Sequence, residues 1–127
     1  MESIARSRGL AGESIAALFL EARGYTILAR NFRVNRRELD LIAERGRLLV
    51  AVEVKWRRAG DAFGSAAQAW RTAQRARAAE AWLTARAAFP DGESRPWRFD
   101  LITIEEDAHG LRLEHRRGAW SPAGSWW

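Results

Sequence analysis

Residues 37–58 have the sequence RELDLIAERGRLLVAVEVKWRR, which predicts two β-strands joined by a tight turn. Gly46 supplies the backbone freedom that such a turn requires. If Arg45 and Gly46 form a two-residue turn, the numbers of residues that face each other across the hairpin sum to 91. This register decides which side chains of the two strands come together.

The two faces of the predicted hairpin differ in chemistry, because side chains alternate along a strand. Glu38 opposes Glu53 in this register. Asp40 opposes Ala51, and Lys55 lies one step beyond on the same face. The other face is entirely apolar and consists of Leu39, Leu41, Ala43, Leu48, Val50, Val52 and Val54.

The carboxylates on the polar face are costly, since like charges repel and half-buried carboxylates must take up a proton or a cation. A divalent cation meets this need, because Mg²⁺ prefers oxygen ligands and binds carboxylates together with waters and a substrate phosphate. Asp40 and Glu53 are diagonal neighbours and can share one Mg²⁺ or Mn²⁺. Lys55 points the same way, toward a phosphate or an attacking water. The alternative is a solvent-facing hairpin with ordinary charge alternation.

Lysine usage favours the chemical interpretation. The chain has 21 Lys and Arg residues, and Lys55 is the single lysine among them. A compact ammonium and a planar guanidinium are not interchangeable. The one lysine therefore lies where a metal-phosphate site would use it, two residues after Glu53.

Composition indicates one folded domain that spans residues 1–127. Hydrophobic residues make up 47% of the chain, no apolar run is long enough to cross a membrane, and no signal peptide is recognisable. The absence of cysteine agrees with a cytoplasmic location. A net charge of +5 favours a polyanionic partner such as nucleic acid.

The rest of the chain predicts an alternation of helices and strands around the hairpin. Residues 1–9 form a basic arm, and residues 117–127 form a Trp-rich tail that covers the body of the domain. Between them we expect a helix over 11–23, a strand over 25–34, a loop over 59–65, a helix over 66–88, a polar loop over 90–96, and strands over 97–105 and 111–115.

Three further polar residues are open to more than one interpretation. Glu13 lies in the first turn of the predicted first helix, where a carboxylate is favourable in itself, although it could also be a metal ligand. Asp100 is expected to pair with an arginine and to be structural. His109 and His115 are not spaced as zinc ligands.

Several short motifs in this order together resemble one family. They are Gly12-Glu13, Gly24-Tyr25, Asn31-Phe32-Arg33, Glu38-Leu39-Asp40-Leu41-Ile42-Ala43, Val52-Glu53-Val54-Lys55, Arg98-Phe99-Asp100, and His115 with Ala119-Trp120. The chain resembles the YraN family of small bacterial proteins. The pair Asp40 and Glu53-Val54-Lys55 is also similar to the D…E-x-K signature of the restriction-endonuclease-like nucleases.

This resemblance implies an α/β fold with a restriction-endonuclease-like core, a mixed sheet with helices on both faces in the order α-β-β-β-α-β. It further implies a Mg²⁺-dependent nuclease site formed by Glu13, Asp40, Glu53 and Lys55. Glu13 gains weight as a ligand, because the similar archaeal Holliday-junction resolvases also use a glutamate on a helix.

The sequence thus predicts a metal-dependent phosphodiesterase that acts on DNA, including branched or damaged forms. Arg36, Arg37, Arg57 and Arg58 would hold the nucleic-acid backbone. A nucleic-acid-binding module that has the nuclease fold without turnover is the main alternative. A scaffold protein whose carboxylates are only surface charge is another, and a homodimer is left open.

Overall fold

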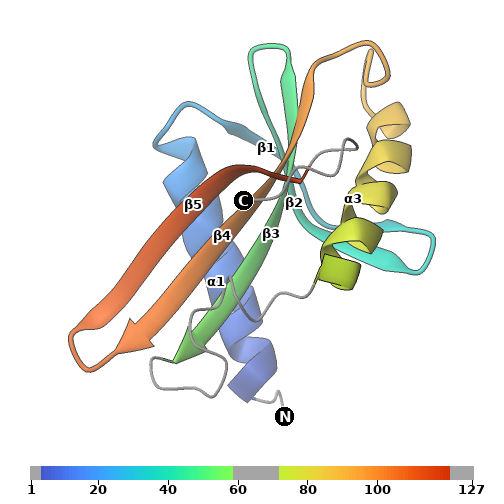
Figure 1. The fold of residues 1–127 in the computed structure, drawn as a ribbon. Helices are drawn as coiled ribbons and strands as arrows, with labels where there is room; N and C mark the ends of the chain where they lie inside the picture. The colour runs from blue at the N-terminus through green and yellow to red at the C-terminus, as the bar shows by residue number, and fades with distance from the viewer. Residues whose placement is uncertain (1–3, 59–71, 121–127) are drawn as a thin grey trace.

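The computed structural model describes residues 4–58 and 72–120 (Figure 1). A helix comes first, three strands follow, and a second helix precedes the last two strands. The elements are α1 (Ile4–Glu21), β1 (Thr26–Val34), β2 (Arg37–Arg45), β3 (Leu48–Arg58), α3 (Thr72–Ala85), a 3₁₀ turn η1 (Arg86–Ala88), β4 (Trp97–Asp107) and β5 (Gly110–Trp120).

The strands form one mixed sheet in the order β1-β2-β3-β4-β5. Only β3 and β4 are parallel among the described pairs, and the chain between them includes α3, since a parallel pair requires a crossover connection. Figure 1 shows α1 behind the sheet and α3 in front of it. The predicted α/β fold, with a mixed sheet and helices on both faces, is confirmed.

Each helix buries its own core against one face of the sheet. The core under α1 joins Ala16, Ala17, Leu20, Tyr25, Leu41, Ala43, Val50, Val52, Ile102 and Ile104. The core under α3 includes Trp82 together with Leu39, Ile42, Leu49, Ala51, Phe99 and Leu101. Small alanines on both helices allow them to pack close to the strands.

The turn of the central hairpin differs from the predicted one. Arg45 pairs with Leu48, so that the two-residue turn is Gly46-Arg47 and the numbers of opposing residues sum to 93 rather than 91. Gly46 has a φ of 60°, as the first central residue of a type II′ turn requires. The predicted register was therefore wrong by two residues. A shift of two keeps every side chain on its face.

The predicted faces are confirmed for most of the hairpin and wrong at one position. Leu41 and Val52 pack under α1 as expected. Leu39 instead packs in the core under α3, so that the alternation of β2 is broken at Asp40.

The predicted boundaries of the first helix and of the last strand also differ. The first helix begins at Ile4, so residues 4–9 are helical rather than an arm, and Glu13 lies in the middle of α1 rather than in its first turn. The last strand extends to Trp120, which leaves 121–127 of the predicted tail outside the described residues. The loop expected over 59–65 also lies outside them, as does the start of the second helix. Neither described helix is long and apolar enough to cross a membrane.

Trp82 is expected to be the largest single contributor to the core under α3. Its side chain is completely buried, and its Nε1 donates a hydrogen bond to the Arg98 carbonyl oxygen at 3.1 Å. Trp82→Ala should lower the free energy of unfolding by about 3–5 kcal/mol, through lost burial and a cavity. Urea unfolding measures this loss. Leu18→Ala is the control, because Leu18 is 68% exposed, and an equal loss in both variants would contradict this packing.

Candidate metal centre

The candidate site lies where β2 and β3 stop pairing. Their pairing runs from Arg45–Leu48 and ends at Leu41–Val52, and we call the region just beyond this last pair the fork. There the Val54 N–H donates a hydrogen bond to Asp40 Oδ2 at 2.8 Å. A side-chain oxygen thus takes the place of a backbone partner, and it holds the Asp40 carboxyl against β3. Figure 1 shows β2 turning to one side here while β3 continues downward.

Glu53 lies beside Asp40 at the fork, and each carboxyl group affects the pKa of the other. Glu53 is only 7% exposed. Burial, and then the negative charge of Asp40, raise the pKa of Glu53 well above its ordinary value. Burial also raises the pKa of Asp40, although the Val54 N–H opposes this shift. Two full negative charges on this pair are therefore unfavourable.

One carboxyl oxygen of this pair has no hydrogen-bond partner among the described residues. It is Glu53 Oε1, which is buried. A buried oxygen of this kind is rare, because no hydrogen bond compensates for its lost hydration. The fork thus contains an acceptor oxygen that would be stabilised by a cation or by a hydrogen-bond donor.

Glu13 and Glu38 bring two more carboxylates to the fork. Oxygen atoms of Glu13, Glu38 and Asp40 all lie within 4.8 Å of one another. Burial, followed by the charge of Asp40, raises the pKa of Glu13 to about 7. We call Glu13, Glu38, Asp40 and Glu53 the carboxylate cluster.

Close packing of α1 on β3 delivers Glu13 to this cluster. Gly12 is buried, and a Cβ added to it would lie 3.3 Å from Trp56 Cε3 and 3.5 Å from Val54 Cγ1. Without a side chain at this position, the helix backbone approaches the strand closely. The preceding glycine of the Gly12-Glu13 motif therefore sets the position of the glutamate.

Asn31 also contacts the cluster, from β1. With its amide nitrogen turned toward the carboxylates, Asn31 Nδ2 lies 3.0 and 3.1 Å from the two oxygens of Glu13 and 3.0 Å from Glu38 Oε1. Asn31 has a φ of 51°, a left-handed conformation that asparagine tolerates better than most residues. This local kink aims the amide at the cluster.

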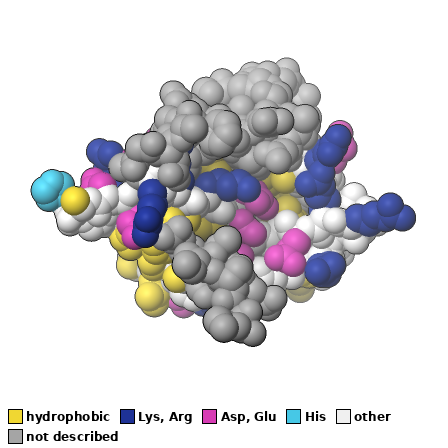
Figure 2. Space-filling view, turned by 90° about the horizontal axis from the view of Figure 1, so that it is seen from below, with side chains coloured by type: hydrophobic (Ala, Val, Ile, Leu, Met, Phe, Trp, Pro, Cys, Tyr) yellow, Lys and Arg dark blue, Asp and Glu magenta, His cyan; other side chains and the backbone are white. Residues whose placement is uncertain are grey.

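Two members of the cluster, Glu13 and Glu38, face a hollow of about 490 Å³. Its lining consists of Gly9, Leu10, Glu13, Asn31, Arg33 and Glu38. Figure 2 shows acidic side chains gathered toward the middle of the lower face, with Lys and Arg side chains beside them. The hollow thus gives an ion or a larger ligand access to Glu13 and Glu38.

The predicted site residues come together only in part. Asp40 and Glu53 meet at the fork as their spacing suggested, and Glu13, which only the family resemblance had implied as a ligand, lies beside Asp40. The charge of Lys55 lowers the pKa of both Asp40 and Glu53, so its ammonium lies within electrostatic reach of them. Sequence reasoning placed Glu38 on the correct face but did not name it as a ligand, and it gave no role to Asn31 beyond the Asn31-Phe32-Arg33 motif.

The four predicted phosphate-binding arginines differ in exposure. Arg36 and Arg58 are exposed, and Arg37 is half-buried. Arg57 is buried, with its Nε donating to the Arg58 carbonyl oxygen at 3.4 Å. Their role on a nucleic acid stays a prediction.

The donor set fits a hard divalent cation. The carboxylates of Glu13, Glu38, Asp40 and Glu53 are all oxygen donors, and Mg²⁺ and Mn²⁺ prefer oxygen ligands. The raised pKa values indicate that these carboxylates lack a cationic partner strong enough to keep them ionised. A cation would compete with protons for these carboxylates and would be coordinated by Glu53 Oε1.

Residues 12–104 match the uncharacterised protein family UPF0102. The chain belongs to this family. It is 40% identical to a UPF0102 protein of Erythrobacter litoralis over 94% of this chain and 97% of that protein. It is 42% identical to relatives from Symbiobacterium thermophilum and Azorhizobium caulinodans, over 84% and 94% of this chain and 89% and 87% of those proteins. The resemblance to the YraN family is thereby confirmed, and the match to UPF0102 covers the whole carboxylate cluster.

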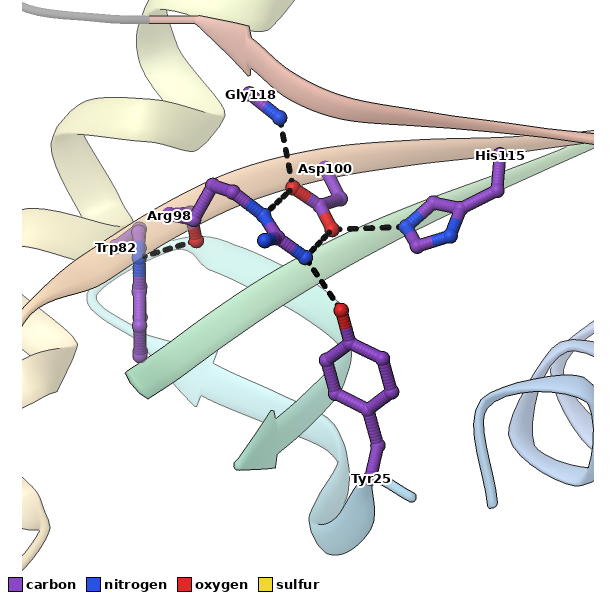
Figure 3. Close-up of polar contacts among 6 residues, drawn as sticks. All are labelled: Tyr25, Trp82, Arg98, Asp100, His115 and Gly118. Carbon is purple, nitrogen blue, oxygen red and sulfur yellow. Dashed lines mark hydrogen bonds and ion pairs between the residues drawn. The ribbon is translucent and has the colours of Figure 1, made fainter. Parts of the chain in front are cut away.

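Asp100, in the family motif Arg98-Phe99-Asp100, has the structural role that the sequence predicts. Arg98 donates to both of its oxygens, at 2.7 and 2.8 Å. His115 Nε2 and the Gly118 N–H complete the set at 2.8 and 2.9 Å (Figure 3). Burial would raise the pKa of Asp100, but these hydrogen bonds hold it below its ordinary value. Asp100 is therefore a buried, fully paired carboxylate that joins β4 to β5.

The stability of the UPF0102 protein should fall as the pH rises from about 4.5 to about 7. Glu13 holds its proton more tightly in the folded chain than in the unfolded one, so its favourable contribution is complete below pH 4.5 and lost above pH 7. Glu13→Gln should reduce this fall by about 1 kcal/mol, a figure discounted from the full shift because the group is partly exposed.

Urea unfolding at pH 4.5 and pH 8 without divalent metal measures this effect. Glu80→Gln is the matched control, because Glu80 is an exposed glutamate on α3. The same pH dependence in wild type and Glu13→Gln would show that Glu13 is not strained by its neighbours.

Proposed function

We propose that this UPF0102 protein is a divalent-metal-dependent phosphodiesterase that cleaves DNA. The observation that carries the proposal is the carboxylate cluster at the fork, where Glu53 is buried with an unpartnered oxygen. Like charges in a half-buried site are a standing cost to folding. A bound catalytic cation would remove this cost, because it would neutralise the carboxylates.

The cluster residues have distinct parts in this proposal. Asp40 and Glu53 would hold the cation, and Glu13 would complete or orient its surroundings. When bound, Mg²⁺ or Mn²⁺ supplies Lewis acidity and lowers the pKa of a bound water. Hydrolysis adds that water across one P–O bond of the phosphodiester, giving an alcohol and a phosphate monoester.

Lys55 is the proposed electrostatic partner of the reacting phosphate. Its charge already acts on Asp40 and Glu53, so the ammonium would also attract a phosphate bound beside these carboxylates. A preorganised charge beside a reacting phosphate stabilises the negative charge of the transition state. Lys55 thus completes a site for phosphoryl chemistry, which a calcium-type structural site would not need.

DNA is the proposed substrate because of the charge of the chain. The net charge of +5 favours a polyanion, and Arg36, Arg37, Arg57 and Arg58 lie at the ends of the strands that carry the cluster. Counterion release would make binding depend steeply on salt. The proposal includes branched and damaged DNA as substrates, a cytoplasmic location, and a homodimer for substrates with two strands to cut.

Cleavage of a labelled DNA panel with Mg²⁺ or Mn²⁺ tests the proposal. The panel holds single strand, duplex, flap and four-way junction. We expect wild type to cleave at least one of them, and Glu53→Gln and Lys55→Ala each to lose at least about 100-fold in rate, in line with the loss of an electrostatic group. DNA binding by Glu53→Gln should persist, because this change removes no positive charge from the surface.

Glu114→Gln is the matched control for Glu53→Gln, since it removes an exposed carboxylate on β5. It should cleave at the wild-type rate. Binding without cleavage of any panel member, with either metal, would instead make the protein a nucleic-acid-binding module. Equal loss of binding and cleavage in Glu53→Gln would also contradict the assignment.

A further inference from the structure

A second hollow, of about 370 Å³, shares no lining residue with the carboxylate cluster. It lies at the end of α1 and is lined by Phe19, Arg23, Tyr25, Arg45, His115 and Arg117. We call these six residues the basic pocket. Three of them are arginines and none is a carboxylate, so the pocket is built for an anion.

The aromatic rings of the basic pocket hold two of its guanidinium groups in place. The Arg23 guanidinium lies 3.6 Å from the centroid of the Phe19 ring. The Arg45 guanidinium lies 4.8 Å from the centroid of the Tyr25 ring. A guanidinium stacked on a ring loses little of its capacity to donate, because its N–H groups point outward in the plane. A guanidinium group thus lies over one face of each ring, where it would compete with a stacked base, and this favours an anion as the ligand.

The charges of these arginines are not neutralised within the described part of the chain. Arg23 donates to the Phe19 carbonyl oxygen at 3.4 Å, but neither it nor Arg45 or Arg117 forms an ion pair there. The neighbouring Glu44 is paired with Arg95 at 2.7 Å. The nearest acidic side chain on the same strand is therefore engaged elsewhere.

A hydrogen-bonded network holds two of the residues that line the basic pocket, Tyr25 and His115. Figure 3 shows Asp100 at the centre of a network that fixes Tyr25 and His115. Arg98 donates to the Tyr25 hydroxyl at 2.6 Å as well as to Asp100. Because a carboxylate only accepts, His115 Nε2 carries the hydrogen in its bond to Asp100. Asp100 is thus saturated and neutralised beneath the pocket.

We propose that the basic pocket binds a phosphate group of the nucleic-acid backbone, as an anchor separate from the carboxylate cluster. Arginine binds phosphate oxygens through paired N–H groups, and the three arginines that line this hollow can donate to the two non-bridging oxygens of a backbone phosphate. Phe19 follows Glu13 by six residues on α1, an axial separation of about 9 Å. A strand held at the cluster reaches the pocket within a few nucleotides. This inference rests on the proposed function in taking DNA as the ligand.

Salt-dependent binding of a labelled DNA duplex tests the anchor. Arg45→Gln and Arg117→Gln should each weaken binding and reduce the slope of log K against log salt by about 1, as expected for one lost phosphate contact. Arg47→Gln is the matched control. Arg47 is an exposed arginine two residues from Arg45, and it does not line the pocket. Equal changes in the pocket variants and in Arg47→Gln would overturn the proposal, because they would indicate only diffuse charge.

Inorganic phosphate distinguishes a backbone phosphate from a free one. Phosphate at fixed ionic strength should compete with DNA on wild type and not on Arg45→Gln. If phosphate instead raises the melting temperature of wild type alone while the salt slopes of all variants agree, the pocket takes free phosphate and the backbone assignment is wrong. Absence of both effects overturns the anchor altogether.

The outcome is separable from that of the proposed function. If wild type binds DNA without cleaving it and only the pocket variants lose slope, the anchor stands and the phosphodiesterase fails. If wild type cleaves DNA and the salt slope of Arg45→Gln is unchanged, the phosphodiesterase stands and the anchor fails.

Discussion

The hydrogen bond from the Val54 N–H to Asp40 Oδ2 is the interaction on which the site depends. It occurs at the point where β2 and β3 stop pairing. A backbone donor at such a point would otherwise be left without a partner, at a cost comparable to a lost hydrogen bond. Asp40 satisfies it and is thereby fixed at the fork. Its carboxyl then becomes the centre around which Glu13, Glu38 and Glu53 gather.

The cores on the two faces of the sheet hold this arrangement in place. The core under α1 fixes the helix that carries Glu13, and Gly12 lets that helix lie close to β3. The core under α3 takes Leu39, the neighbour of Asp40, onto the opposite face. Apolar burial on both faces therefore offsets the desolvation of a carboxylate cluster that would not assemble by itself. Burial and the charge of Asp40 raise the pKa values of Glu13 and Glu53, because the charged cluster is unfavourable without a cation.

Much of this could be predicted from the sequence, because alternation along a strand is a local property. The apolar and polar faces of the hairpin, and the meeting of Asp40 with Glu53, follow from it. The register was wrong because Gly46 could occupy either central position of a two-residue turn, and only the twist of the strands selects the first. Leu39 and Asn31 could not be placed, since each depends on a local break in a strand that no residue pattern announces. The start of α1 was missed because the serine and the glycine in its first turns are weak helix formers, so propensity alone places the start of the helix after them.

The most direct test of the account is the position of Mn²⁺ in crystals of the protein, read from its anomalous scattering. The account predicts one or more peaks at the fork, within about 2.0–2.3 Å of carboxylate oxygens of Asp40 and Glu53, and the loss of those peaks in Glu53→Gln. Crystals that bind Mn²⁺ only elsewhere, or that show no peak at the fork at high Mn²⁺, would contradict it.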